Sequence, residues 1–337
     1  MKNRIDTSRR KTPWDNCTET STVQSFIMNK YKDNYYIKHQ KLLDTNENIL
    51  INSIEIDDCP YCRNKNICKK GFTNNKIQRY YCYNCKRRFT PLTNTIFDDH
   101  KLPITEWIEF LNDIFNYGSI SLTSKVNKNS VTTTTYWLQK LFCLLRVYNQ
   151  NIKLSGTVYL DEFYYSVIKS DIELKEDGTK LRGISRNKYC IEIAYDKTNI
   201  IATIEGLGKP TVNKTRKAFL EHIENGSKLI HDDEKSHKIL IEELELKDEC
   251  YKSIDLKELN DDNNPLRPIN HQCDLLRQFL NVHSGFDRNY LQDYLNLYCF
   301  MNSGKSKNKL EKINFIRVCF KNKSKFKISK YVFKELN

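Results

Sequence analysis

Two pairs of cysteines have the spacing of a metal site. Cys59 and Cys62 form one Cys-x-x-Cys pair, and Cys82 and Cys85 form a second pair that is separated from the first by nineteen residues. Each pair can fold into a tight turn that presents two thiolates, and two such turns close a tetrahedral Zn²⁺ site. Because four thiolates leave no open coordination position, the predicted zinc is structural.

Other roles for these cysteines fit the spacing less well. A Cys-x-x-Cys sequence can be a redox pair, but that role requires a single motif beside a βαβ unit. Cys68 lies between the two pairs and could compete as a ligand, although its position in the middle of the loop favours a bystander role.

Two aspartates are the second candidate for chemistry. Asp161 and Asp232 each end a short β-rich run, and each is followed by another acidic residue. Carboxylates at the ends of neighbouring strands can share Mg²⁺ or Mn²⁺ ions, which would activate a water or a 3′-hydroxyl in phosphoryl transfer. The alternative is that both aspartates are turn formers or caps. His231 and His237 flank Asp232, and we assign them no role.

The hydrophobic pattern predicts the elements that must position these residues. Helices are expected from Trp107 to Gly118, at 120–126 and at 131–147; strands at 157–161, 189–195 and 200–204; then a helix at 212–223, a strand at 228–232, a helix at 235–244, a weak strand at 250–254 and two helices between 271 and 301. This order predicts a mixed α/β sheet flanked by helices.

Charge is distributed unevenly along the 337 residues, whose formal net charge is +13. Residues 1–150 and 302–337 are each basic, whereas residues 151–301 are acidic overall. This arrangement suits a protein that binds a polyanion and keeps carboxylates for another purpose. With 39% hydrophobic residues and no long apolar run, a membrane protein is excluded, and the twelve cysteines indicate a reducing compartment.

Several residues are candidates for DNA contact. The window 59–89 holds nine lysines and arginines and no acidic residue, and we expect Arg79, Lys86, Arg87 and Arg88 to face phosphate. The helices at 120–126 and 131–147 resemble a helix-turn-helix, in which Thr132 and Thr133 could contact phosphate at a helix start. The alternatives are a solvated surface and an ordinary helical connector.

Longer segments resemble a known family. "RYYCYNCKRRFTPLTNTIF" and "LPITEWIEFL" are similar to the N-terminal region of bacterial insertion-sequence transposases. "VYLDEFYYSVIKSD", "KLRGISRNKYCIEIAYD", "LIHDDEKSH" and "INHQCDLLRQFLNVHSGFDRNYLQDYLNLYCF" resemble their catalytic domain. The resemblance is to the insertion-sequence group fifteen-ninety-five, of the ISXO type, and it runs from about Cys59 to Met301.

We expect the chain to divide into five parts, of which the first and the last lie outside the resemblance, and the resemblance implies an RNase H-like core of the DD(E/N) type. The parts are an N-terminal extension (1–58), a zinc ribbon (59–100), a helix-turn-helix-like module (101–150), an RNase H-like transposase domain (151–302) and a basic tail (303–337).

The resemblance also assigns catalytic positions. Asp161 and Asp232 match the two catalytic aspartates. The third position, Glu or Asn in the family, falls on Cys273, and a family lysine falls on Leu280. Cysteine is a poor ligand for a hard cation, and leucine cannot contact phosphate. Asn270 and Asp274 are the candidates for a replacement third group.

Two functions follow from the resemblance. The first is an insertion-sequence transposase that cuts DNA at element ends and joins the freed 3′-OH to target DNA, using structural Zn²⁺ and catalytic Mg²⁺ or Mn²⁺. It would act as a dimer or larger assembly on DNA, in the cytoplasm with the nucleoid, or in the nucleus of a eukaryotic host. The second is a transposase-derived DNA-binding protein with impaired catalysis, which the replacements at Cys273 and Leu280 favour. A zinc-ribbon transcription regulator ranks last because it leaves the α/β half without a role.

Overall fold

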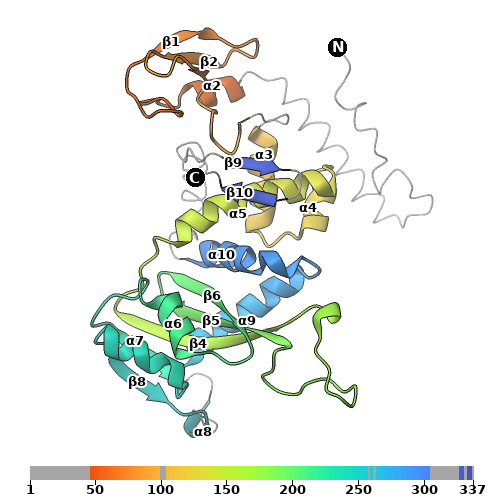
Figure 1. Ribbon diagram of the computed structural model, residues 1–337, viewed down its shortest axis with the longest axis vertical. Coiled ribbons are helices and arrows are strands. Elements are labelled where there is room, and N and C mark those ends of the chain that lie inside the picture. Colours follow the sequence, from red (N-terminus) through yellow and green to blue (C-terminus); the bar gives the residue numbers. More distant parts are fainter. Residues whose placement is uncertain are drawn as a thin grey trace, which may run out of the picture. The chain divides into compact units, whose positions relative to one another are not determined.

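The computed structural model describes residues 46–98, 104–256, 259–260, 263–303, 326–329 and 332–335 (Figure 1). Most of the predicted N-terminal extension (1–58) and basic tail (303–337) lies outside the described residues. The chain divides into two compact units, Met1–Lys140 with Ile313–Asn337, and Leu141–Lys312. The finer division into five parts stays a prediction.

The first unit contains a small cysteine-bearing sheet. Strands β1 (Ile67–Phe72), β2 (Gln78–Cys82) and β3 (Arg88–Phe89) pair antiparallel in that order, after helix α2 (Asn46–Asn52). Its buried centre is Cys59, Tyr80, Cys82 and Phe89. A core of four residues is too small to hold a module of this size without a further cross-link.

Three helices follow in the same unit, close to the predicted bounds. They are α3 (Ile104–Phe115), α4 (Ile120–Val126) and α5 (Val131–Asn149), which runs on into the second unit. Ser119 caps α4 by accepting the N–H of Leu122 at 3.2 Å. Asn127 ends α4 and donates from its side chain to Asp113 Oδ2 at 2.5 Å. In the unit's final described elements, β9 (Phe326–Ser329) pairs antiparallel with β10 (Val332–Glu335).

The second unit is built on a five-stranded mixed sheet. Its strands are β4 (Thr157–Ser166), β5 (Lys188–Tyr195), β6 (Ile200–Leu207), β7 (Lys228–Asp232) and β8 (Lys247–Tyr251). The spatial order is β6-β5-β4-β7-β8, with β4, β5 and β6 antiparallel and β4, β7 and β8 parallel. The predicted mixed α/β fold is confirmed, and this strand order is that of an RNase H-like sheet.

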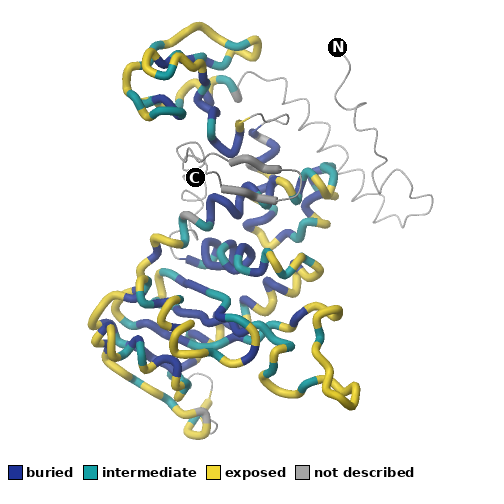
Figure 2. The backbone as a smooth tube through the Cα atoms, in the orientation of Figure 1, coloured by how far each residue is buried: buried dark blue, intermediate teal, exposed yellow. Residues whose placement is uncertain are grey.

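Helices cover both faces of the sheet. These are α6 (Val212–Phe219), α7 (Lys238–Glu243), α9 (Arg267–Val282) and α10 (Leu291–Asn302), with a short α8 (Ser253–Leu256) after β8 (Figure 1). Leu160 and Ala194 of the strands pack with Phe219 and Leu240 on the α6 and α7 side. The other side is covered by α9 and α10, which contact β4, β5 and β6. Buried residues accordingly concentrate in the central strands and in α10 (Figure 2).

The strand that carries Asp161 is longer than predicted. β4 continues to Ser166 because it pairs with β5 as far as Ser166↔Lys188, whereas its pairing with β7 stops at Leu160↔His231. The prediction that Asp161 ends its strand is therefore wrong. Asp161 is instead the first residue of β4 beyond the last pair with β7, which brings it to the same sheet edge as the end of β7.

Several further bounds differ from the prediction: β6 continues to Leu207 and not to residue 204, and α6 ends at Phe219 and not at residue 223. β8 runs over Lys247–Tyr251 and not 250–254, because its parallel register with β7 starts at Lys228↔Lys247. α9 begins at Arg267 and not at residue 271, since Pro268 occupies the first turn, where its missing N–H costs nothing. Within the described part of the chain, no helix combines the length and apolarity needed to cross a membrane.

Leu280 offers a test of the register of α9. Its side chain is fully buried, so Leu280→Lys would place an ammonium group in the core. We expect this change to lower the free energy of unfolding by more than about 3 kcal/mol, measured by urea denaturation. Leu280→Met is the matched control and should cost less than about 1.5 kcal/mol. A Leu280→Lys protein as stable as wild type would contradict the burial of this position.

Candidate metal centres

The structure brings the four predicted zinc ligands together. Cys59 Sγ lies 3.6 Å from Cys85 Sγ, and Cys62 Sγ lies 3.6 Å from Cys82 Sγ. All four sulfur atoms lie within 4.8 Å of one another. Zn–S bonds of about 2.3 Å in a tetrahedron place sulfur atoms about 3.8 Å apart, so the four thiols fit zinc. Cys68, in β1, is not part of this group.

Two of the thiols differ in their acidity. Hydrogen bonds from the backbone N–H of Asn64 and the amide of Asn84 lower the pKa of Cys62 to about 6. Burial raises the pKa of Cys59 to about 12. A buried thiol of this kind ionises only when a cation compensates its charge, as a zinc ion would.

Replacing Cys82 tests the zinc assignment. Cys82→Ser removes one of four thiolates, so we expect the bound zinc to fall from about one ion per chain to well below half. The loss should unfold the small sheet, because its core alone is insufficient. Metal analysis by mass spectrometry measures the zinc content. Cys68→Ser is the control and should keep its zinc, and a Cys82→Ser protein with full zinc would refute the four-cysteine site.

The predicted DNA-contact residues of this unit lie on or near its surface. Lys86, Arg87 and Arg88 are exposed around the last two strands, and Arg87 stacks over the Tyr61 ring at 4.9 Å. Arg79 is half-buried in β2. Of the two candidates in α5, Thr132 is exposed, whereas the Thr133 hydroxyl lies 2.9 Å from the Ser130 hydroxyl. DNA contact by these residues stays a prediction.

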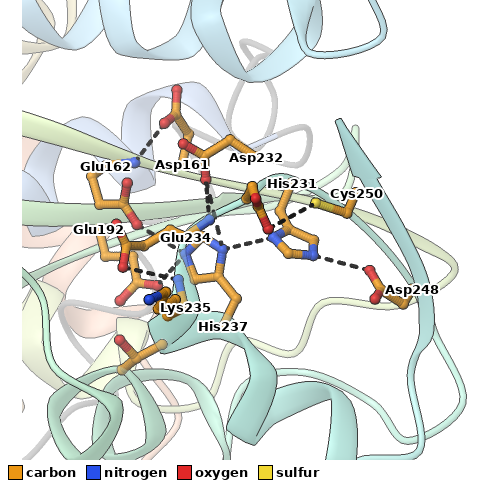
Figure 3. A network of polar contacts seen from close by, with 12 residues as sticks. Asp161, Glu162, Glu192, His231, Asp232, Glu234, Lys235, His237, Asp248 and Cys250 are labelled. Carbon is orange, nitrogen blue, oxygen red and sulfur yellow. Dashed lines mark hydrogen bonds and ion pairs between the residues drawn. The ribbon is translucent and has the colours of Figure 1, made fainter. Parts of the chain in front are cut away.

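The two predicted catalytic aspartates converge at one edge of the second unit's sheet. Asp161 of β4 and Asp232 at the end of β7 join Glu162, and oxygens from all three lie within 4.8 Å of one another (Figure 3). The Glu162 N–H donates to Asp161 Oδ1 at 2.8 Å, which fixes the orientation of that carboxylate. Three oxygen ligands at this spacing suit a hard divalent cation such as Mg²⁺ or Mn²⁺.

The third position is occupied by a thiol. Cys273 of α9 points to this group, with its Sγ 3.9 Å from Asp161 Oδ2. Asp274, the neighbouring acidic candidate, is 61% exposed and forms an ion pair with Arg277. Asn270 is also exposed. The structure therefore does not bring Asp274 or Asn270 into the carboxylate group, although both line the cavity beside it.

That cavity has a volume of about 700 Å³ and an unusual lining. Asp161, Glu162 and Cys273 contribute to it, together with three basic side chains, which are Lys188, Arg267 and Arg277. Basic groups beside clustered carboxylates provide what a phosphodiester requires: cations that hold the phosphate and acids that hold a metal ion.

The Asp161 carboxyl is strongly perturbed. Burial, followed by the nearby Glu162 and Asp232 charges, raises its pKa to about 7. The unfolded chain loses this proton near pH 4. As pH rises from about 4 to 7, the metal-free protein is therefore destabilised, because the unfolded state ionises before the native state does. A bound cation would remove this penalty.

The pH dependence of Mn²⁺ binding follows from the raised pKa. Below pH 7 a proton competes for Asp161, so we expect the Asp161-dependent affinity to fall up to about tenfold per pH unit as pH drops from 7 to 5.5. Above pH 7.5 the affinity should be nearly constant. Calorimetric titration of wild type and Asp161→Asn isolates this component. An Asp161-dependent affinity that does not change between pH 5.5 and 7 would contradict the assignment.

Behind this edge lie polar residues to which the sequence pattern assigns no role. His237 Nε2 lies 2.9 Å from Glu162 Oε1 and 3.2 Å from Glu192 Oε1. His237 Nδ1 lies 2.9 Å from His231 Nδ1, and His231 Nε2 lies 3.0 Å from Asp248 Oδ1 (Figure 3). The one feature of the sequence that could have indicated this polar group is Glu192, an acidic residue inside an otherwise apolar strand.

Two solved structures are similar to the chain, each at low sequence identity and low TM-score. No family model and no curated protein matches the chain. One solved structure that is similar to the chain is the simian T-cell lymphotropic virus intasome in complex with PP2A regulatory subunit B56 gamma. It is 9% identical over 57% of this chain and 67% of that chain, with a TM-score of 0.28. Another is the Mos1 transposase paired-end complex with left transposon end, 13% identical over 60% of this chain and 78% of that chain, with a TM-score of 0.20.

The order and direction of the five strands, and not these similarities, define the class of the second unit. It is an α/β unit with an RNase H-like sheet that carries clustered carboxylates at one edge.

Proposed function

We propose that this protein is a transposase of the insertion-sequence type, with DNA phosphodiesters as its substrate. The observation that carries the proposal is the convergence of Asp161, Glu162 and Asp232 from two parallel strands. Asp232 is distant in the sequence from the other two, and apposing several carboxylates is costly unless a cation binds between them. The resemblance to the insertion-sequence group fifteen-ninety-five supports the same function.

The chain's own residues divide the work between holding metal and holding DNA. Asp161, Glu162 and Asp232 would hold Mg²⁺ or Mn²⁺, which supplies an activated water or 3′-hydroxyl and stabilises the leaving oxygen. Lys188, Arg267 and Arg277 would bind the phosphates on either side of the cleaved bond. Positioning and electrostatics would account for the rate, and no covalent enzyme intermediate is needed.

The other parts of the chain would bind and pair the DNA. The four cysteines would hold one structural Zn²⁺ in a zinc ribbon, which would present Lys86, Arg87 and Arg88 to phosphate. The helices around Thr132 would act as a helix-turn-helix, and the basic tail would add non-specific affinity. Because both element ends must be joined to one target, we expect a dimer or larger assembly on DNA, with the nucleoid in the cytoplasm of a bacterial host or in the nucleus of a eukaryotic one.

One observation favours a second function. A thiol stands at the third catalytic position, where Cys273 faces Asp161, and a thiol is a poor ligand for Mg²⁺. A transposase-derived protein that binds element ends without cutting them would have this feature. Cysteine suits thiophilic cations, so the metal used in an assay decides how severe the replacement is.

A nicking assay separates the two functions. The substrate is supercoiled plasmid carrying the genomic DNA that flanks the coding sequence, incubated with protein and Mn²⁺ or Mg²⁺. We expect nicking by wild type. Asp161→Asn and Asp232→Asn should reduce it by about 100-fold or more, because the metal contributes several kcal/mol to transition-state stabilisation.

Asp233→Asn is the matched control. Asp233 is exposed, adjacent to Asp232, and outside the carboxylate group, so its replacement should leave nicking nearly unchanged. DNA binding by all variants is measured by gel shift. Binding without nicking by wild type in both metals would reject the enzyme in favour of the second function, and full nicking by Asp161→Asn would reject the site.

A further inference from the structure

A second group of ligand-type side chains is enclosed behind the carboxylate edge. Glu162 of β4 and Glu192 of β5 are direct cross-strand partners, so both project to the face of the sheet opposite Asp161. His237 lies over them, at the end of the short 3₁₀ helix Lys235–His237 (Figure 3). The side chains of Glu192 and His237 are 0% exposed and that of Glu162 is 6% exposed.

This enclosed group contains more carboxyl groups than basic groups. Glu205 lies within hydrogen-bond distance of Glu192, and one of its oxygens accepts from the Thr215 hydroxyl at 2.7 Å. Neither oxygen of Glu192 has a hydrogen-bond donor in good alignment, and the other Glu205 oxygen has none either. Among the described residues, His237 is the one cationic partner within ion-pair distance of these glutamates. Burying unpaired carboxylates is costly, so the group calls for another cation or for protons.

The geometry around His237 Nε2 is that of converging ligands. Nε2 is 2.9 Å from Glu162 Oε1 and 3.2 Å from Glu192 Oε1, but neither contact has the alignment of a hydrogen bond. Atoms that ligate one metal ion in tetrahedral or octahedral geometry lie about 3 to 3.4 Å apart and all point to a common centre. Short contacts without alignment are expected when side chains face a shared point and not one another.

We propose that Glu162, Glu192 and His237 bind a divalent transition-metal cation, of the Mn²⁺ or Zn²⁺ class, at a site separate from the Asp161 and Asp232 edge. An imidazole together with two carboxylates suits these cations and disfavours Mg²⁺ and Ca²⁺, which prefer oxygen ligands. Metal binding would displace the proton from His237 Nε2, and this proton passes to solvent.

The surroundings of His237 are those of a metal-ligating histidine. Its other ring nitrogen contacts His231 Nδ1 at 2.9 Å, and His231 in turn contacts the Asp248 carboxylate at 3.0 Å. A chain of this kind fixes the ring orientation and the tautomer of a ligand histidine. Asp232 Oδ1 is 4.0 Å from His237 Nδ1. Glu162 belongs both to the group with Asp161 and Asp232 and to the enclosed group. The enclosed ion would thus fix the position of Glu162 beside Asp161.

Mn²⁺ binding by the full-length protein tests the proposal. Wild type, Asp161→Asn, Glu192→Gln and Glu249→Gln are freed of loosely bound metal with a mild chelator that leaves the cysteine-bound zinc. Mn²⁺ stoichiometry is then measured by electron paramagnetic resonance, and the thermal midpoint is measured with and without Mn²⁺. Glu249 of β8 is half-buried, pairs with Lys228 outside both carboxylate groups, and serves as the matched control. Zinc content and circular dichroism report whether each variant folds.

We expect Asp161→Asn and Glu249→Gln to keep one Mn²⁺ that Glu192→Gln loses. At a hundredfold excess over Kd, this ion should raise the midpoint of Asp161→Asn by about 5 to 10 °C. Without metal, Glu192→Gln should melt no lower than wild type, because it removes a buried carboxylate charge. Glu192→Asp, which keeps the carboxylate, should bind Mn²⁺ more weakly than wild type but more tightly than Glu192→Gln.

Three outcomes would overturn the enclosed site. The first is Mn²⁺ binding that is equal in wild type and Glu192→Gln. The second is an Asp161→Asn protein that binds no Mn²⁺, a result that needs no substitution within the enclosed group. The third is a His237 ring that stays doubly protonated by ¹⁵N NMR in excess Zn²⁺, which would make it an imidazolium paired with Glu162 and Glu192. Loss of the Asp161-dependent ion alone would instead count against the proposed function.

Discussion

Carboxylates that converge at a partly buried site repel one another. The packing and strand register of the second unit keep them together at one edge of the sheet. Asp161 and Asp232 lie at one edge because β4 continues for several residues beyond its last pair with β7. Apolar layers on both faces keep that register, since a shift by one residue would exchange the two faces of β4. Burial and neighbouring charge raise the pKa of Asp161 to about 7, and a bound cation would oppose both effects.

The same constraint explains the different environments of neighbouring residues. Asp161 faces α9 and the cavity with its basic lining, whereas the carboxylate of Glu162, a residue that also borders this cavity, contacts His237 beside Glu192. Alternation along one strand therefore divides the acidic residues between an accessible group and an enclosed one. Glu162 belongs to both groups, so metal binding at one site would change the position or charge of a ligand at the other.

Much of the fold could be predicted from the sequence, because its elements have clear hydrophobic periods. The order of strands and helices beyond Gly156 and the grouping of the four cysteines rest on local patterns. The length of β4 could not be predicted, because it depends on pairing with β5, which is a non-local property. The contact of Cys273 with Asp161 depends on where α9 begins and on how it packs on the sheet. Glu192 and His237 are 45 residues apart, and nothing in the sequence alone joins them.

The central claim is that Asp161 and Asp232 jointly hold a divalent cation. Anomalous X-ray diffraction from crystals of the full-length protein grown with Mn²⁺ tests it most directly. The account predicts a manganese peak within about 2.0 to 2.6 Å of a carboxylate oxygen from each of the two aspartates. Ordered Asp161 and Asp232 side chains with no manganese peak between them would contradict it.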